Sequence, residues 1–289
     1  PVMGIEPAQN IAKSAIEKNI PTLTKFFDSH LAKDLVSKKK TADLIIGNNV
    51  FAHVPCLNDF VIGLKILLKP NGVITLEFPH LLQLMQNNQF DTIYHEHFSY
   101  FSLITAKKIF EYHGLKIFDV EELSTHGGSL RLYITHFDNN QINKSTEVDL
   151  IIEKEKKFGL TQINTYENFS KNIIQIKINL LNFIEKTKKN SKTLVCYGAP
   201  AKGNTLLNYC GLSKTQIDYT VDKNPSKQNL FLPGTHIPIF SPEKIKETKP
   251  DFILILPWNL QEEILNELNY VKSWGCQFII SIPEVKVLQ

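Results

Sequence analysis

The richest group of chemically capable side chains lies in Phe90–Ser102, with the sequence FDTIYHEHFSYFS. Its thirteen positions hold five aromatic residues, two histidines, one glutamate and three serines or threonines. Surface loops are usually mobile and seldom hold so many rings. In an extended conformation Tyr94 and Glu96 would point to one side and His95 and His97 to the other. A turn would instead gather Tyr94, Glu96 and His97 together.

Three interpretations of this segment are open. Proton transfer by a histidine near neutral pH is the one that the residue types favour most. His95 and His97, two positions apart, could instead hold zinc, but no third ligand stands at a suitable spacing. The segment could also be an aromatic cluster with a purely structural function.

Polar side chains also stand at the ends of predicted strands, where doubly wound folds bind their ligands. Glu6 ends the first predicted strand and could accept both hydroxyls of a ribose, or it could be an ordinary surface acid. Asn48, Asn49 and His53 follow a later strand. If the turn there is helical, Asn49 and His53 face the same way. Asn49 could instead cap a helix.

The segment His126–Arg131, HGGSLR, contains the only arginine among 32 basic residues. A guanidinium group holds a carboxylate or a phosphate at two points, which an ammonium group cannot do. Arg131 could therefore bind a phosphate, and a structural salt bridge is equally open. The two glycines allow either a close approach of the backbone to a ligand or a sharp entry into a strand.

Tyr197–Thr205, YGAPAKGNT, follows a predicted strand and opens a helix. Its spacing is close to that of the phosphate-binding loop G-x-x-x-x-G-K-[ST]. Asn204 stands at the lysine position and Pro200 removes a backbone donor, so ATP hydrolysis is not expected. A helix N-terminus with Lys202 nearby still suits a nucleotide-sugar diphosphate. The alternative is a tight strand-to-helix turn without a ligand.

The first part of the chain alternates strands with helices, which is the pattern of a doubly wound α/β sheet. No Gly-x-Gly occurs, so the pattern begins one strand late, and the glycine-rich loop would lie upstream. We predict strands at Val2–Glu6, Pro21–Phe26, Ala42–Asn48 (a buried run), Val73–Phe78, Leu115–Glu121 and Ser129–Phe137. We predict helices at Ala8–Lys18, Ser29–Ser37, Cys56–Leu68 (stopped by Lys69–Gly72) and Leu103–His113.

The rest of the chain is predicted to form a charged helical segment and then a second, smaller α/β unit. The helical segment runs from about Ser145 to Asn190. One long helix is expected at Glu262–Trp274. The strands of the second unit are expected at Thr193–Tyr197, Ile217–Val221, Asp251–Leu256 and Gln277–Ile282.

Composition limits the function classes. The chain has 289 residues, 43% of them hydrophobic, and its net charge of +3 comes from 32 basic and 29 acidic side chains. Nucleic-acid-binding surfaces concentrate far more positive charge, so no nucleic-acid partner is expected. No apolar run is long enough to span a membrane. The four cysteines lie far apart and form no zinc or disulfide pattern, which favours a reducing cytoplasm and no metal site.

Five segments of the chain carry a resemblance to a known family. They are Asn49–His53 (NVFAH), Phe90–Ser102, Ser124–Tyr133 (STHGGSLRLY), Tyr197–Asn208 (YGAPAKGNTLLN) and Val221–Gln228 (VDKNPSKQ). Together they resemble the sugar C-methyltransferases, which use S-adenosylmethionine to methylate a ring carbon of a nucleotide-linked keto-deoxysugar. In that family a zinc-binding module precedes the methyltransferase domain, and a Rossmann-like domain follows it. The zinc module and the first strand of the methyltransferase domain have no counterpart in this sequence.

The resemblance implies a function for each candidate in the reaction. His97 would be the base that removes the proton next to the sugar ketone, giving an enolate that attacks the donor methyl group. Tyr94 and Glu96 would order the base or bind the sugar oxygens. His53 and Asn49 would line the same cleft.

The resemblance also implies the ligand contacts. Glu6 would hold the ribose of S-adenosylmethionine, with Asn48 and Asn49 at the same donor site. Zinc is implied only for the module that this sequence lacks. The nucleotide-linked sugar would be bound by Lys202, Asn204, Arg131 and His126.

The predicted fold class is α/β, with two Rossmann-like doubly wound domains, the first incomplete at its N-terminus, joined by a helical segment. The expected boundaries are 1–140 for the methyltransferase domain, 141–190 for the helical bridge and 191–289 for the nucleotide-sugar-binding domain. Two other functions are open. One is a nucleotide-sugar-binding protein without catalysis, or an inactive fragment of the enzyme. The other is an NAD-dependent dehydrogenase or epimerase. Such an enzyme would need a Gly-x-Gly loop, which is absent, and would be expected to use a Tyr-x-x-x-Lys pair.

Overall fold

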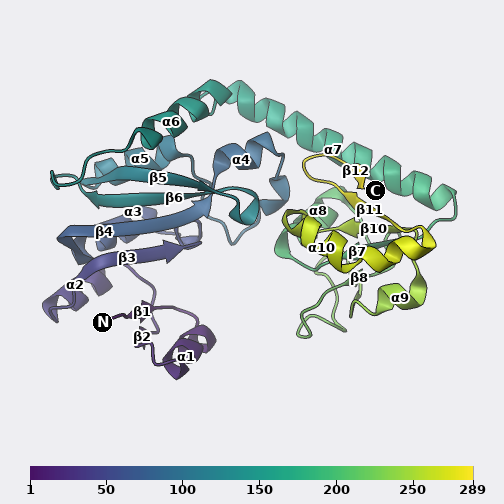
Figure 1. Ribbon diagram of the computed structural model, residues 1–289, viewed down its shortest axis with the longest axis horizontal. Coiled ribbons are helices and arrows are strands. Elements are labelled where there is room, and N and C mark those ends of the chain that lie inside the picture. The colour runs from purple at the N-terminus through teal and green to yellow at the C-terminus, as the bar shows by residue number, and fades with distance from the viewer. Residues whose placement is uncertain (289) are drawn as a thin grey trace. The chain divides into compact units, whose positions relative to one another are not determined.

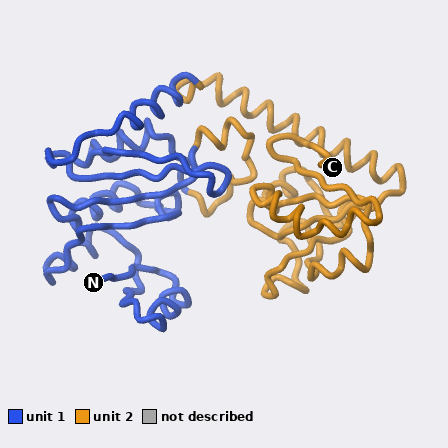
Figure 2. The backbone as a smooth tube through the Cα atoms, in the orientation of Figure 1, with its two compact units in different colours: residues 1–80, 98–157 blue, residues 81–97, 158–289 orange. Residues whose placement is uncertain are grey.

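The computed structural model describes residues 1–288, and its elements fall into two units (Figure 1). Unit 1 contains Pro1–His80 and Phe98–Lys157, and unit 2 contains Leu81–His97 and the chain from Phe158 onward. Figure 2 colours unit 1 blue and unit 2 orange. The short segment Leu81–His97 therefore belongs to unit 2, although both of its neighbours along the chain belong to unit 1.

Unit 1 is built on a four-stranded sheet with the order β3-β4-β6-β5. β3 (Ala42–Asn48) and β4 (Leu68–Pro79) are parallel, whereas β6 (Ser129–His136) is antiparallel to both β4 and β5 (Leu115–Leu123). The strands predicted in these four places are confirmed. β6 lies in the middle of the sheet, so its side chains have neighbours on both sides.

The prediction that the apolar run Ala42–Asn48 is buried is wrong in part. Leu44 is 54% exposed and Ile46 is 65% exposed. Within the described residues β3 pairs only with β4, so it forms an edge of the sheet, and the face with these two side chains is uncovered.

The first two strands form a small parallel sheet of their own. β1 (Gly4–Ile5) pairs with β2 (Thr22–Leu23), and α1 (Gln9–Glu17) connects them. Both strands are shorter than predicted and neither extends the four-stranded sheet. Pro7 and Pro21 flank the ladder, and proline has no N–H to donate to it.

Two helices of unit 1 pack together, α2 (Ser29–Ser37) and α3 (Leu57–Leu67). Asp28 caps α2, since its Oδ1 accepts a hydrogen bond from the Leu31 N–H at 2.7 Å. The apolar side chains Leu35 and Leu67 are buried together with Leu31 in a small cluster.

The predicted end of this helix before Lys69–Gly72 is confirmed, since α3 ends at Leu67. The next strand starts earlier than the predicted Val73, because β4 begins at Leu68, directly after α3. The register of the β3–β4 ladder shifts between Ala42 and Leu44, so the extra residues are taken up as an irregularity within the strand. Lys69 there forms an ion pair with Asp43 at 2.7 Å.

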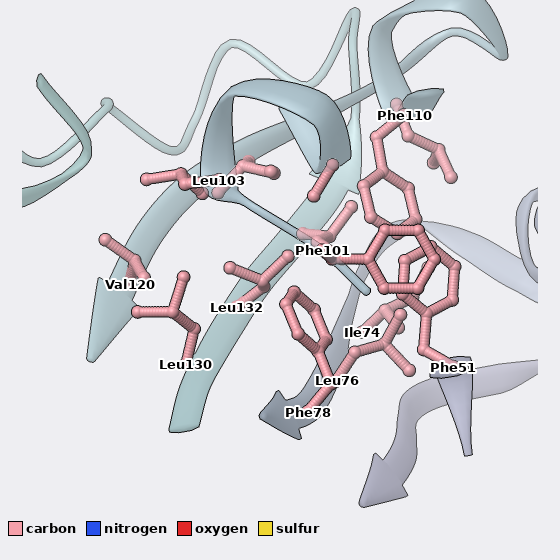
Figure 3. Close-up of a cluster of buried hydrophobic side chains, with 14 of the residues drawn as sticks. Phe51, Ile74, Leu76, Phe78, Phe101, Leu103, Phe110, Val120, Leu130 and Leu132 are labelled. Atoms are coloured by element: carbon pink, nitrogen blue, oxygen red, sulfur yellow. The ribbon is translucent and has the colours of Figure 1, made fainter. Parts of the chain in front are cut away.

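The core of unit 1 is rich in phenylalanine (Figure 3). Phe51, in the short 3₁₀ helix η1 (Phe51–His53), stacks on Phe101 with ring centroids 4.3 Å apart and on Phe110 at 5.4 Å. Phe78 of β4 contacts the edge of Phe101 at 5.4 Å. Phe51 and Phe101 both lie close in sequence to predicted site residues, so the core fixes the backbone on which those residues stand.

The helical segment predicted from Ser145 to Asn190 is confirmed as two helices, α6 (Thr146–Phe158) and α7 (Ile163–Lys189). Val148 and Ile151 of α6 belong to the core of unit 1. The buried side chains of α7 belong instead to the core of unit 2. The boundaries 1–140, 141–190 and 191–289 remain a prediction.

Unit 2 contains a six-stranded sheet with the order β12-β11-β10-β7-β8-β9. The first strand along the chain, β7, lies inside the sheet, and later strands add on both sides of it, which is the doubly wound arrangement. All pairs are parallel except β11–β12, and the α/β class is confirmed. The strands are β7 (Leu194–Tyr197), β8 (Thr220–Val221), β9 (Ile239–Phe240), β10 (Phe252–Ile255), β11 (Gln277–Ile280) and β12 (Lys286–Leu288).

The single long helix predicted at Glu262–Trp274 is wrong. α10 (Gln261–Glu267) ends early, and a 3₁₀ helix, η5 (Asn269–Trp274), follows it. Leu268 and Val271 are both buried, and the Val271 N–H bonds to the Leu268 carbonyl three residues back. This tighter winding brings both side chains to the same face. Besides α7, the α-helices of unit 2 in the described residues include α4 (Leu81–Gln86), α8 (Ala201–Cys210) and α9 (Lys244–Thr248).

Candidate active site

The segment Phe90–Ser102 adopts the turn rather than the extended conformation. It begins with the 3₁₀ helix η2 (Phe90–Thr92), and the His97 N–H then bonds to the Tyr94 carbonyl at 3.0 Å. The rings of Tyr94 and His97 lie 4.4 Å apart, and both side chains are half-buried. The turn therefore brings together the two ring-bearing members of the predicted Tyr94, Glu96 and His97 group, and leaves Glu96 exposed.

His97 is held in one orientation by its own loop. Its Nδ1 lies 3.0 Å from the Thr92 carbonyl oxygen. Because a carbonyl oxygen only accepts, Nδ1 donates this bond, and in the neutral ring Nε2 is the nitrogen that can take up a proton. The arrangement is suited to a general base.

Tyr94 has a raised pKa. Burial of the phenol is the main cause, and the negative charges of Glu96 and Asp91 add to it. The hydroxyl therefore stays protonated near neutral pH and can donate a hydrogen bond to a developing negative charge.

The chain attaches to unit 1 directly after His97. The Phe98 N–H bonds to the Ala52 carbonyl at 2.8 Å, next to His53 at the end of η1. His53 is half-buried. Backbone bonding thus fixes the position of Phe98 relative to the turn that carries His53.

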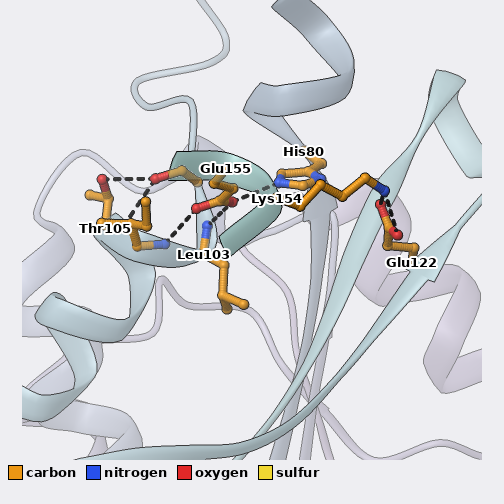
Figure 4. A network of polar contacts seen from close by, with 8 residues as sticks. His80, Leu103, Thr105, Glu122, Lys154 and Glu155 are labelled. Atoms are coloured by element: carbon orange, nitrogen blue, oxygen red, sulfur yellow. Dashed lines mark hydrogen bonds and ion pairs between the residues drawn. The ribbon is translucent and has the colours of Figure 1, made fainter. Parts of the chain in front are cut away.

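A buried polar network holds the far end of the segment (Figure 4). Glu155 of α6 accepts hydrogen bonds from His80 Nε2 at 2.7 Å and from the Leu103 and Ile104 N–H groups. These two N–H groups open α5 (Leu103–Tyr112), and Glu155 is fully buried. A carboxylate there satisfies donors that the helix itself cannot. Nothing in the sequence predicted this network, because its members are some fifty to seventy-five positions apart.

The two candidates Asn49 and His126, predicted for different ligands, are in contact. Asn49 Nδ2 lies 2.8 Å from His126 Nε2. Asn49 has a left-handed backbone with φ of 54° and precedes η1, whose N-cap is Val50 without a side-chain bond. The alternative that Asn49 caps a helix is therefore wrong. It also lies outside the helical turn that would have aligned it with His53.

Arg131 forms the salt bridge that the sequence left open. On the central strand β6 it stands directly opposite Glu77 of β4 and Glu121 of β5. Its Nη2 lies 2.9 Å from Glu77 Oε2, and its Nη1 lies 3.3 Å from Glu121 Oε2. Glu77 is buried and also accepts a hydrogen bond from Thr125 Oγ1. Arg131 therefore neutralises a buried carboxylate, and its contact with a phosphate remains a prediction.

The donor-site candidates lie at strand ends, as predicted. Glu6 follows β1, and its Oε1 accepts a hydrogen bond from the Ala8 N–H at 2.8 Å. Asn48 is the exposed last residue of β3. The oxygen Oε2 of Glu6 and the amide of Asn48 are groups that can bind ribose hydroxyls.

In unit 2, the turn from β7 to α8 is tight and closed by hydrogen bonds. Asp222 Oδ2 accepts from the Ala199 N–H at 2.7 Å, and Lys227 Nζ donates to the Ala199 carbonyl at 2.9 Å. Gly198 has φ of 90°, and a Cβ there would lie 2.6 Å from Pro257. The backbone N–H of Ala199 is thus already used by Asp222.

Lys202 and Asn204 lie in the first turn of α8. Lys202 Nζ lies 4.3 Å from the centre of the Trp258 ring and donates to Asn259 Oδ1 at 2.7 Å. Burial lowers the pKa of Lys202, while the charge of Asp91 raises it. Asn204 Oδ1 is buried and has no hydrogen-bond partner in the described part of the chain.

Two features are absent from residues 1–288. No helix there is long and apolar enough to cross a membrane. No group of three or more His, Cys, Asp or Glu side chains in that range is arranged to hold a metal ion.

Comparison with known proteins supplies the family. A model described as the C-methyltransferase C-terminal domain matches residues 124–283, and one described as a methyltransferase domain matches residues 1–120. The C-methyltransferase NovU of Streptomyces niveus is 35% identical over 99% of this chain and 68% of its own length.

Solved structures show only weak likeness. A SAM-dependent methyltransferase from Anabaena variabilis is 16% identical with a TM-score of 0.38, covering 47% of this chain and 68% of its own. Magnesium protoporphyrin IX methyltransferase from Synechocystis with bound SAM is 16% identical with a TM-score of 0.33, covering 47% and 59%.

Proposed function

Because the chain belongs to the C-methyltransferase family, we propose that it methylates a ring carbon next to the ketone of a nucleotide-linked deoxysugar. The observation that carries the proposal is the setting of His97. Its Nδ1 is bonded to the Thr92 carbonyl, which leaves Nε2 as the basic nitrogen, and the Tyr94 ring lies beside it.

The proposed mechanism is proton abstraction followed by carbon–carbon bond formation. His97 Nε2 takes the proton from the carbon next to the ketone, and the electrons of that C–H bond form an enolate. Tyr94 donates a hydrogen bond to the enolate oxygen. General-base catalysis of this kind contributes roughly 10²- to 10⁴-fold to the rate. S-adenosylmethionine would supply the electrophilic methyl group, which the enolate carbon would take as the methyl–sulfur bond breaks and S-adenosylhomocysteine leaves.

The donor would be held by residues of unit 1. Glu6 uses Oε1 for the Ala8 N–H, and Oε2 is an acceptor for the ribose hydroxyls. Asn48 and Asn49 add amide groups at the end of β3, which belongs to the separate four-stranded sheet. The chemistry of these side chains fits the ribose of S-adenosylmethionine.

The nucleotide-linked sugar would be bound through its diphosphate by Lys202 and Asn204 in the first turn of α8. The cation and the partial positive charge of a helix N-terminus both favour an anion. Arg131 and His126 remain predicted substrate contacts, and their partners in the structure are carboxylates and Asn49. We also retain the cytoplasm as the predicted compartment, since all four cysteines are free thiols.

Proton exchange tests the proposal directly. A panel of nucleoside diphosphate-linked keto-deoxysugars is incubated with the protein in D₂O, and NMR follows the proton next to the ketone. We expect exchange with the wild type and none with His97→Asn, while calorimetry gives similar nucleotide dissociation constants for both. Exchange at the wild-type rate in the variant would show that His97 is not the base. Binding without exchange in the wild type would favour the non-catalytic alternative.

A further inference from the structure

The loop that carries His97 is anchored in unit 2 by two consecutive residues, Phe90 and Asp91. Phe90 is 5% exposed and belongs to the core of unit 2, with its ring 5.1 Å from that of Tyr209 on α8. Asp91 is fully buried. Both residues lie in η2, five or more positions before the chain passes to unit 1 after His97.

Asp91 binds the indole of Trp258. Its Oδ2 accepts a hydrogen bond from Trp258 Nε1 at 2.8 Å. Lys202 Nζ lies over the face of the same ring, so the indole has Asp91 at its edge and a cation on its face. Asp91 Oδ1 is buried and has no hydrogen-bond partner within the described residues. Burial of a carboxyl group is unfavourable, so its presence here calls for a function.

Asp91 is one residue away from the acceptor that orients the base. Thr92 follows Asp91, and the Thr92 carbonyl accepts the hydrogen bond from His97 Nδ1. Thr92 is itself fixed, since its Oγ1 donates to the Gln89 carbonyl at 2.7 Å. A rotation of the backbone at Asp91 would therefore move the carbonyl oxygen that accepts the hydrogen bond from His97 Nδ1.

We propose that Asp91 is a positioning residue that, through its hydrogen bond to Trp258, holds the Thr92 carbonyl in place and so orients the imidazole of His97. The proposal rests on the proposed function of His97 as the base. It assigns no contact between Asp91 and the substrate. Trp258 is the second residue of this positioning contact, because its indole N–H donates the hydrogen bond to Asp91.

The test compares variants that remove the bond with one that retains it. Trp258→Phe removes the donor but keeps a ring for Lys202, and Asp91→Leu removes the acceptor. Asp91→Asn keeps an oxygen that can accept from the indole. The matched control is Trp274→Phe, whose indole N–H donates to the Pro250 carbonyl at 3.1 Å elsewhere in unit 2.

Two readouts are measured, the exchange rate of the sugar proton and the ¹⁵N chemical shifts of His97, assigned by difference from His97→Asn. We expect Trp258→Phe and Asp91→Leu to lower the exchange rate roughly 10- to 100-fold, as for a misplaced reacting group. We also expect them to convert the Nδ1-protonated ring into a mixture of tautomers. Asp91→Asn and Trp274→Phe should keep both readouts near the wild type.

Several outcomes would overturn the proposal. Unchanged exchange and unchanged tautomer in Trp258→Phe would do so, even if Asp91→Leu fails to fold. A loss of exchange with the tautomer unchanged would also contradict it. If the wild type shows no exchange at all, the proposed function fails, but the tautomer of His97 still decides whether Asp91 and Trp258 orient the ring.

Discussion

One nitrogen of His97 can take up a proton because the other is bonded to a carbonyl oxygen. The residue types in this segment predicted proton transfer by a histidine, which stays a prediction, and they left the extended conformation and the turn both open. The Thr92 contact could not be predicted, because it depends on the backbone angles of the intervening residues. Asp91 was likewise missed, since an acid in a loop gives no sign that it will be buried against Trp258, 167 positions away.

The buried carboxyl group of Asp91 makes a prediction about stability and pH. Burial raises the pKa of Asp91 from 3.8 to about 7, against the lowering effects of the Trp258 bond and the Lys202 charge. Tyr94 also faces this group. Between pH 4 and 7 the folded protein keeps a proton that the unfolded chain has released. The contribution of Asp91 to stability is therefore fully present below pH 4 and is lost as the pH rises to 7.

Asparagine has no titratable proton, so the Asp91→Asn variant should not show this loss of stability as the pH rises. We expect the stability of the variant relative to the wild type to increase by up to about 4 kcal/mol between pH 4 and pH 8. Urea unfolding at the two pH values, followed by tryptophan fluorescence, measures the difference. A difference that stays constant with pH would mean that Asp91 is already ionised in the folded protein near pH 4.

At the scale of elements, the prediction succeeded where local signals were strong. The helix Ser29–Ser37 and the strand Ala42–Asn48 have the predicted bounds. The strand start predicted at Val73 and the single helix predicted at Glu262–Trp274 differ from the structure, because bulges and changes of helical pitch follow from packing and strand pairing, not from local composition. The start of α5 also depends on distant residues, because Glu155, which accepts hydrogen bonds from its first two N–H groups, lies on another helix.

Removing Glu155 should therefore weaken unit 1. In Glu155→Ala, His80 Nε2 and two backbone N–H groups lose their acceptor in the interior. We expect a loss of about 3 kcal/mol in the free energy of unfolding. Far-UV circular dichroism in urea measures it. Glu153→Ala on the same helix is the control, because its exposed ion pair with Lys156 should matter by less than about 1 kcal/mol. Equal losses in both variants would contradict the assignment.

At the scale of the whole molecule, the two units are not consecutive stretches of chain. Seventeen residues, 81–97, are inserted into the sequence of unit 1 but fold with unit 2. The proposed base is therefore carried by unit 2, whereas Glu6, Asn48 and Asn49 belong to unit 1. The sequence predicted two α/β units, yet it could not show this exchange, because the residues that attach the insertion have their partners far away in the sequence. Phe90 is the clearest example, because its ring lies in a core formed by helices and strands that are distant in the sequence.

The division of the chain into units predicts a large loss of stability for one phenylalanine and almost none for another, eight positions away. Phe90→Ala should leave a cavity in unit 2 and cost about 3–5 kcal/mol. Phe98→Ala, on the unit 1 side of the division, alters a side chain that is 61% exposed and should change stability by less than about 0.5 kcal/mol. Trp258 and Trp274, the only tryptophans in the chain, both lie in unit 2, so their fluorescence in urea reports the unfolding of that unit. If Phe90→Ala left this transition unchanged, the loop of His97 would not be an integral part of unit 2, and the positioning of the base would need a different origin.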